Sequence, residues 1–129
     1  VRASVEDARH LLGAQPHQAD EVTRRFVAWG ARIGIVSLGK EGAILSTRQA
    51  TFRVPALPGK PADTTGAGDS FSAGFLVAYL RTQNPEFAAR FASAVALHVI
   101  EGTGGVSVAR MPTQAQVEET LRQNGVVLL

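Results

Sequence analysis

The chain has 129 residues, enough for one domain with a hydrophobic core, and its 45% hydrophobic and 19% charged residues are ordinary for a globular protein. The absence of cysteine excludes disulfides, thiolate metal sites and cysteine nucleophiles, and it agrees with the cytoplasmic location that we expect. The net charge of +2 is spread over scattered basic residues, and no apolar run is long enough for a bilayer, so neither nucleic acid nor a membrane is an expected partner.

Two helices and a buried strand are predicted for the first third of the chain. Ser4 has an acidic residue three positions later, which is typical of a helix start, so a helix is predicted over residues 4–12 with its end at Gly13. A second helix is predicted over residues 19–29, since its apolar residues recur on one face. The apolar run 33–38 predicts a strand buried on both faces, as in a parallel sheet.

The middle of the chain predicts a hairpin and a loop. Residues 39–42 read as a turn, and Ala43–Ser46 and Thr51–Val54 read as two strands of a hairpin. Residues 56–62 contain three prolines and predict a loop.

Helices are predicted for most of the C-terminal half. Residues 70–80 and 86–100 are helical in pattern, and the second of these is apolar all round, which indicates a buried helix. Thr113 is the expected start of a last helix, and residues 126–129 are an expected edge strand. Strands that alternate with helices predict an α/β fold, in which ligands lie at the carboxyl ends of the strands.

The run Asp63-Thr64-Thr65-Gly66-Ala67-Gly68-Asp69-Ser70-Phe71 leads from a turn of small residues into a helix. Small residues let the backbone approach a ligand, and the first amides of a helix point outward as donors, so Gly66, Ala67 and Gly68 predict an anion site. The carboxylate of Asp69 would repel an anion unless it takes a proton from a hydroxyl that attacks phosphorus. Taken alone, the pattern also fits an ordinary helix start in which Asp69 complements the helix dipole.

The same run, followed by Ala73-Gly74-Phe75, closely resembles the C-terminal signature of the PfkB, or ribokinase-like, carbohydrate kinases. The resemblance implies a ribokinase-like α/β fold, with a mostly parallel sheet flanked by helices in a Rossmann-like three-layer arrangement. It covers the chain almost end to end but only the C-terminal part of the family. We therefore expect residues 1–129 to be the nucleotide-binding and catalytic-base part of a kinase domain, without its N-terminal half and lid.

The activity that the resemblance implies is ATP-dependent phosphoryl transfer to a hydroxyl of a sugar. Asp69 would be the general base, and the amides of Gly66, Ala67, Gly68 and Asp69 would stabilise the charge on the transferring group. A nucleoside acceptor, as in adenosine-like kinases, is an alternative because that branch shares the signature. A stand-alone nucleotide-binding module without activity is another, although a pure binder has no need of Asp69. The surface that the missing half would cover invites association with that half or in a homodimer.

Further nucleotide contacts are implied for a strand-end loop and a helix. Ser37, Gly39, Lys40 and Gly42 lie in a loop that alone reads as a plain turn, but similar loops in the family lie along the nucleotide. Lys40 then contacts a phosphate or only water. Ser93 matches a family position beside the adenine ring, although a small packing residue is an equally simple interpretation.

Two cation sites are implied. Ser4 and Asp7 stand where many members carry an Asn-x-x-Glu motif for Mg²⁺, and Asp7 keeps a carboxylate there, whereas Ser4 does not replace the amide. Asp63, the carbonyl of Thr65 and carbonyls of residues 99–104 match a monovalent cation site that suits K⁺. The alternative is that Asp63 only fixes the turn by hydrogen bonds to the backbone.

Overall fold

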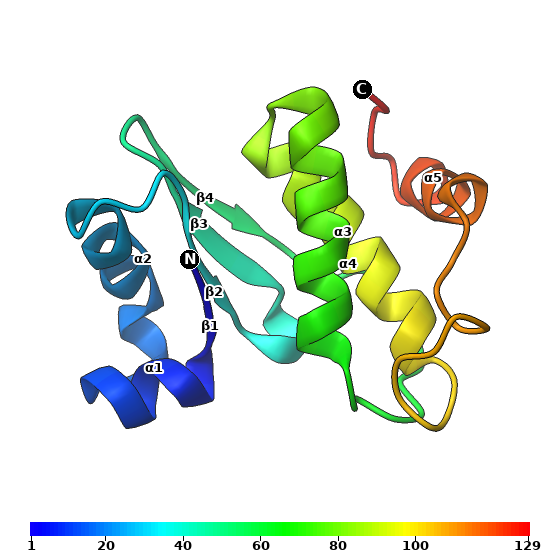
Figure 1. Ribbon diagram of the computed structural model, residues 1–129, viewed down its shortest axis with the longest axis horizontal. Helices are drawn as coiled ribbons and strands as arrows, with labels where there is room; N and C mark the ends of the chain where they lie inside the picture. The colour runs from blue at the N-terminus through cyan, green and yellow to red at the C-terminus, as the bar shows by residue number, and fades with distance from the viewer. The chain divides into compact units, whose positions relative to one another are not determined.

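The computed structural model describes all 129 residues, which form two compact units, Val1–Ala56 and Leu57–Leu129. The elements of the first unit are β1 (Arg2–Ser4), α1 (Val5–Leu12), the 3₁₀ turn η1 (Pro16–Gln18), α2 (Ala19–Ala28), β2 (Gly34–Ser37), the 3₁₀ turn η2 (Gly39–Glu41), β3 (Ala43–Ser46) and β4 (Thr51–Val54) (Figure 1). The second unit contains α3 (Ala67–Thr82), α4 (Pro85–Ile100) and α5 (Gln114–Gln123). No helix has the length and apolar character needed to cross a membrane.

The first unit is built on a four-stranded sheet in the order β1-β2-β3-β4. β1 pairs with β2 in parallel, whereas β2 with β3 and β3 with β4 pair antiparallel, so the predicted hairpin is confirmed. The expectation of a mostly parallel sheet is wrong for these four strands. Short turns join β2, β3 and β4, and such turns permit only antiparallel neighbours, whereas α1 and α2 supply the crossover that the one parallel pair needs. β1 is too short for its pattern to predict it.

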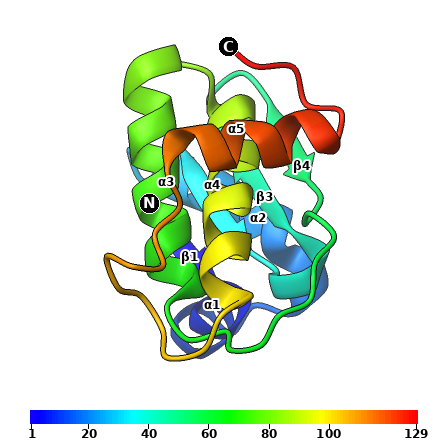
Figure 2. The ribbon, with the colours of Figure 1, turned by 90° about the vertical axis from the view of Figure 1, so that its right-hand side faces the viewer.

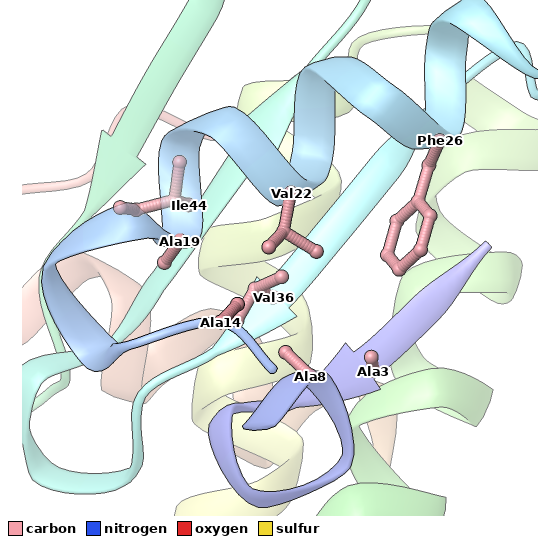
Figure 3. Packing of buried hydrophobic residues seen from close by; sticks show 8 residues of the cluster. All are labelled: Ala3, Ala8, Ala14, Ala19, Val22, Phe26, Val36 and Ile44. Atoms are coloured by element: carbon pink, nitrogen blue, oxygen red, sulfur yellow. The ribbon is translucent and has the colours of Figure 1, made fainter. Parts of the chain in front are cut away.

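The core of the first unit lies where α1 and α2 meet the sheet. Figure 3 shows small and apolar side chains of the helices gathered against Val36 of β2 and Ile44 of β3. The whole cluster comprises Ala3, Ala8, Ala14, Ala19, Val22, Phe26, Val36 and Ile44. α2 approaches β2 so closely that a Cβ on Gly34 would overlap the carbonyl oxygen of Thr23. The apolar periodicity of residues 19–29 therefore does mark the face that packs on the sheet.

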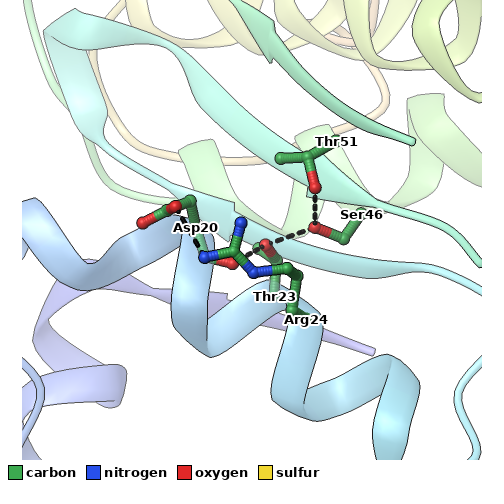
Figure 4. Close-up of polar contacts among 5 residues, drawn as sticks. All are labelled: Asp20, Thr23, Arg24, Ser46 and Thr51. Carbon is green, nitrogen blue, oxygen red and sulfur yellow. Dashed lines mark hydrogen bonds and ion pairs between the residues drawn. The ribbon is translucent and has the colours of Figure 1, made fainter.

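A chain of hydroxyl groups crosses from α2 to the hairpin (Figure 4). Thr23 Oγ1 donates to the carbonyl of Asp20 at 2.8 Å and lies 2.7 Å from Ser46 Oγ, which lies 2.8 Å from Thr51 Oγ1. Thr23 and Ser46 are both fully buried. Because each buried hydroxyl has a partner, the sheet gains polar contacts without an unsatisfied group.

The second unit is an antiparallel pair of helices, α3 and α4, with α5 lying across α4 (Figure 2). A Cβ on Gly74 of α3 would lie 3.0 Å from Val95 Cγ2 and 3.1 Å from Ala92 Cα of α4, so glycine allows the close approach of the two helices. On α5, Val117 and Leu121 are fully buried and form its inner face. α4 is largely buried, as its composition predicts.

The predicted helices of this unit are all present, with small differences at their ends. α3 begins at Ala67, three residues earlier than its apolar pattern, because Ala67 and Gly68 of the turn enter the first helical turn. The predicted edge strand over residues 126–129 is wrong, since these residues form no strand. The second unit contains only helices, so its tail has no strand edge within that unit to pair with.

Candidate active site

The turn that precedes α3 is shaped by one glycine in a left-handed conformation. Gly66 is the N-cap of α3 with φ 80° and ψ 3°, and a Cβ at this position would overlap the side chain of Val106. Both the positive φ and the close contact require glycine. The turn thereby delivers Gly68 and Asp69 into the first turn of the helix.

Most amides of this turn have no acceptor within the chain. The N–H of Ala67 donates to the carbonyl of Thr64 at 3.1 Å, whereas those of Gly66, Gly68 and Asp69 donate to no protein group. Free amides at the start of a long helix, together with its dipole, favour an anion. The geometry thus provides a set of donors that can bind a phosphate group.

Asp69 is exposed, and its carboxylate has no hydrogen-bond donor or cation from the chain. The neighbouring hydroxyls are already used, since Ser70 Oγ donates to the carbonyl of Gly66 at 2.8 Å and Ser72 Oγ donates to that of Gly68 at 2.9 Å. Neither hydroxyl caps the helix or shields the carboxylate. Asp69 is therefore an unpaired base beside unpaired donors, which is the pair of groups that proton removal near a phosphate needs.

Asp63 differs from Asp69, because each of its carboxylate oxygens accepts a hydrogen bond. Asp63 Oδ1 accepts the N–H of Thr65 at 2.9 Å and Oδ2 accepts the N–H of Gly104 at 3.0 Å. Hydrogen bonds from the Thr65 side chain and backbone, and then from Gly104, lower the pKa of Asp63 to about 2. Asp63 thus fixes the turn through the backbone, and the carbonyl of Thr65 accepts no hydrogen bond.

A glycine-rich loop after α4 lies against this turn. It overlaps residues 99–104, whose carbonyls the resemblance implies for the cation site. Gly104 and Gly105 have positive φ values of 96° and 70°, and a Cβ on Gly105 would lie 3.2 Å from Thr65 Cγ2. The same loop carries Val106, which covers Gly66. The sequence signal for this contact is the pair Gly104-Gly105, because glycine permits the positive φ and the close approach that the loop needs.

The loop before the turn is anchored to the end of α4. The N–H groups of Ala62 and Asp63 both donate to the carbonyl of Ile100, at 2.7 and 3.0 Å. The N–H of Lys60 donates to Glu101 Oε1 at 3.2 Å. The end of α4 therefore positions the segment that leads to Asp69.

In the first unit, Asp7 and Ser37 lie at the same edge of the sheet, because Ser4 at the end of β1 is opposite Ser37 at the end of β2. Ser4 and Asp7 form a capping box, in which Ser4 N–H donates to Asp7 Oδ2 at 2.9 Å and Asp7 N–H donates to Ser4 Oγ at 3.0 Å. These backbone and side-chain bonds with Ser4 lower the pKa of Asp7. Ser37 Oγ accepts from Arg2 at 3.0 Å and is thus engaged within the unit.

The turn after β2 exposes two further amides. Gly42 N–H donates to the carbonyl of Gly39 at 3.0 Å, whereas the amides of Gly39 and Lys40 have no acceptor in the chain. Gly39 has φ 58°, and Gly42 has φ 94° in a place where a Cβ would overlap the carbonyl oxygen of Val54. The side chain of Lys40 is exposed and makes no ion pair. The turn offers backbone donors at a strand end, where ligands of α/β folds lie.

Ser93 lies within α4, and its hydroxyl donates to the carbonyl of Ala89 at 3.0 Å. No group of three or more His, Asp or Glu side chains is arranged to hold a metal ion. Asp63, Thr65, residues 66–69 and Ser93 belong to the second unit, whereas Asp7, Ser37 and residues 39–42 belong to the first.

Comparison with known proteins identifies the relatives of this chain. The nucleoside kinase of Methanothermobacter thermautotrophicus is 41% identical over 101 residues, which are 73% of this chain and 32% of that protein. The structure of Arabidopsis thaliana ribokinase complexed with ribose and ATP matches with a TM-score of 0.81 and 26% identity, over 94% of this chain and 40% of that one. A double mutant of Vibrio cholerae fructokinase, in a form bound to fructose, ADP and potassium ion, matches with a TM-score of 0.80 and 26% identity, over 94% and 40%.

The chain thus spans about a third of the length of that curated relative and about two fifths of these solved structures. These neighbours confirm the ribokinase-like fold, of which the chain represents a part. The model of the pfkB family of carbohydrate kinases matches residues 1–113. Together, the match over most of the chain and the shared fold show that this chain belongs to the pfkB family of carbohydrate kinases.

Proposed function

We propose that this chain is the nucleotide-binding and catalytic-base part of a kinase that transfers a phosphoryl group from ATP to a hydroxyl of a sugar. The observation that carries the proposal is Asp69, a carboxylate without a protein partner beside the free amides of Gly66, Gly68 and Asp69 itself. A carboxylate in the first helical turn also complements the helix dipole, and the proposal adds proton removal to that role.

In this mechanism Asp69 accepts the proton of the acceptor hydroxyl as the hydroxyl oxygen forms a bond to the γ-phosphorus of ATP. The bond from that phosphorus to the bridging oxygen breaks, and ADP leaves with the bond's electron pair. The amides of Gly66, Gly68 and Asp69 stabilise the negative charge on the transferring group. Ala67 donates to Thr64 within the turn, so its contribution is its small side chain, which keeps the approach open.

Magnesium would arrive with ATP, because Mg²⁺ is usually held by phosphate oxygens and only one or two carboxylates. Asp7 fits this role in part: one carboxylate oxygen is used in the capping box, and the other accepts no hydrogen bond. Mg²⁺ would screen the phosphate charge. The amides of Gly39 and Lys40 are the candidate nucleotide contacts of the first unit, with Ser37 and Gly42 as further predicted positions there and Ser93 as one in the second unit.

A monovalent cation is proposed beside Asp63 and Thr65. The carbonyl of Thr65 accepts no hydrogen bond and is a suitable ligand for K⁺. Each oxygen of Asp63 already accepts one N–H, so Asp63 would act mainly through its charge. The fructokinase neighbour that contains a potassium ion supports this assignment.

The acceptor is a sugar or the ribose of a nucleoside. The ribokinase neighbour is complexed with ribose, which favours a sugar. The relative with 41% identity is a nucleoside kinase, which favours a nucleoside as the second candidate. Both acceptors present a hydroxyl to the same base, so Asp69 has the same role in each.

The apolar outer face of α3 is the surface proposed for association with the remaining part of a kinase domain. Leu76, Val77 and Leu80 are 58%, 50% and 72% exposed. Exposed apolar side chains that lie together on one helix are typical of an interface. The solved relatives are about two and a half times as long as the part that matches here. They therefore contain further residues that can cover such a face.

Thermal unfolding of this chain with increasing Mg-ATP tests the proposal. A ligand that binds only the folded state raises the melting temperature in proportion to the logarithm of its concentration above the dissociation constant. We expect such a rise with Mg-ATP and none with Mg²⁺ alone. A melting temperature that stays constant up to millimolar Mg-ATP would contradict a nucleotide site in this chain.

A further inference from the structure

We propose that Arg110 is a positioning residue, which holds the glycine-rich loop after α4 in place and thereby sets the turn that carries the free amides and Asp69. The proposal rests on the proposed function, because it assigns a residue that supports that site without contacting the substrate. It starts from an arginine that lies far from the signature run in sequence and forms no ion pair.

The guanidinium of Arg110 lies flat against Gly102. A Cβ on Gly102 would be 2.7, 2.8 and 2.8 Å from Nη1, Cζ and Nη2 of Arg110, and these nearly equal distances place the face of the guanidinium plane over the glycine. Nη1 also donates to the carbonyl of Val99 at 3.4 Å, in the last turn of α4. A cation at the C-terminal end of a helix is favoured by the helix dipole. Arg110 thus joins the far end of the loop to the helix from which the loop departs.

The loop between these two points contacts the turn at three places. Gly104 N–H donates to Asp63 Oδ2 at 3.0 Å, Gly105 is buried and packs against Thr65, and Val106 covers Gly66. Each contact depends on the path of the loop. Gly104 and Gly105 both have left-handed backbone, and as glycines they restrict that path less than other residues would.

The charges around the loop agree with this role. Besides the hydrogen bonds from Thr65 and Gly104, the positive charge of Arg110 is a further cause of the lowered pKa of Asp63. Lysine would keep the charge but not the planar stacking, because its ammonium is a compact point charge. The proposed role therefore requires the planar guanidinium of arginine and not only a positive charge.

The test compares Arg110→Gln, Arg110→Lys and Gly102→Ala in this chain. Gly102→Ala displaces the guanidinium without removing it, so it disrupts the same contact by changing the other partner. Arg81→Gln is the matched control, since Arg81 donates to Gln114 Oε1 at 2.7 Å in the same unit but contacts neither the loop nor the turn. Two measurements are made on each variant: amide hydrogen exchange and NMR shifts of residues 66–69 and 104, and the dissociation constant of Mg-ATP.

For Arg110→Gln and Gly102→Ala we expect at least about tenfold faster exchange of the Gly104 amide, shifted signals for residues 66–69, and at least about fivefold weaker Mg-ATP binding. Arg110→Lys should give intermediate values, and Arg81→Gln should match the parent chain. Unchanged Gly104 exchange in Arg110→Gln would overturn the proposal, and so would faster exchange with unchanged shifts of residues 66–69. If the parent chain binds no Mg-ATP, the proposed function fails, while the exchange and shift measurements still decide whether Arg110 positions the turn.

Discussion

At the residue scale, two carboxylates six positions apart have opposite surroundings. Asp63 accepts two backbone hydrogen bonds, and its pKa is lowered to about 2, whereas Asp69 has no partner in the chain. A carboxylate with saturated oxygens is a poor proton acceptor, because its ionised form is already stabilised. The structure therefore separates the turn-fixing acid from the acid that is free to act on a ligand.

Asp69→Asn tests the base assignment in a protein that carries the complete kinase domain. We expect turnover to fall by about a hundredfold or more, since asparagine cannot take the proton of the acceptor hydroxyl. ATP affinity should change little, because the backbone donors remain. Glu86→Gln is the control, as Glu86 is also an acid in the first helical turn but pairs with Arg90 at 2.9 Å. Near-normal turnover of Asp69→Asn in a steady-state assay would refute the assignment.

Asp63→Asn tests the pH dependence that follows from the lowered pKa. The pKa falls from 3.8 to about 2 on folding, so the folded state binds the proton more weakly than the unfolded state. The contribution of Asp63 to the free energy of unfolding is therefore complete above about pH 4 and is lost as the pH falls toward 2. Urea unfolding between pH 2 and 6 should show the gap between the two proteins closing in that window. A gap independent of pH would show that ionisation of Asp63 does not stabilise the fold.

At the element scale, the start of α3 depends on backbone that only glycine adopts easily. Gly66 combines φ 80° with a contact to Val106, while α3 itself is long and packs on α4 along most of its length. Packing on α4 stabilises the helix, whereas the conformation of the turn sets the directions of its first amides. The turn, rather than the body of the helix, therefore sets the directions of the free amides that we propose for phosphate binding.

Gly66→Ala should destabilise the second unit by about 1–3 kcal/mol, because alanine is strained at this φ and its methyl group meets Val106. Gly125→Ala is the matched control for the backbone term, since Gly125 has φ 72° and open space around it. The double variant Gly66→Ala, Val106→Ala should recover the part of the lost free energy of unfolding that is due to the clash. Chemical unfolding measures all four proteins. Equal losses for Gly66→Ala and Gly125→Ala would show that Val106 gives way freely.

At the scale of the whole molecule, the exposed face of α3 distinguishes this chain from a self-contained domain. Leu80 is 72% exposed and Leu76 is 58% exposed, one helical turn apart on the same face. Apolar faces of this kind are normally covered by other parts of a protein. The relatives that match this chain are much longer, which agrees with a cover supplied by other residues of a kinase domain.

Leu80→Arg should reduce self-association of this chain at high concentration, because a charge on the α3 face opposes burial. Sedimentation velocity over a range of concentrations measures the effect. Val108→Arg is the control, since Val108 is 95% exposed on a loop of the same unit and lies outside that face. If both variants associate as the parent chain does, the α3 face is not the contact.

Local elements of the fold could be predicted well from the sequence. Ser4 and Thr113 cap α1 and α5 as their spacing indicates, and the hairpin of β3 and β4 is where alternating strands predict it. These features depend on residues three to ten positions apart. The short strand β1 and the antiparallel share of the sheet could not be predicted, because strand pairing depends on partners distant in the chain.

The sequence by itself determined the family, the position of Asp69 at a helix start and the small-residue turn before it, since these are encoded in consecutive residues. Only the tertiary structure decided which donors are free and which acid is occupied. Ala67 turned out to be engaged with Thr64, and Asp63 with Gly104, 41 positions away. The physical reason is that a hydrogen-bonding group is free or occupied according to its partner, and which groups become partners depends on the folded path of the turn and of the distant loop that carries Gly104.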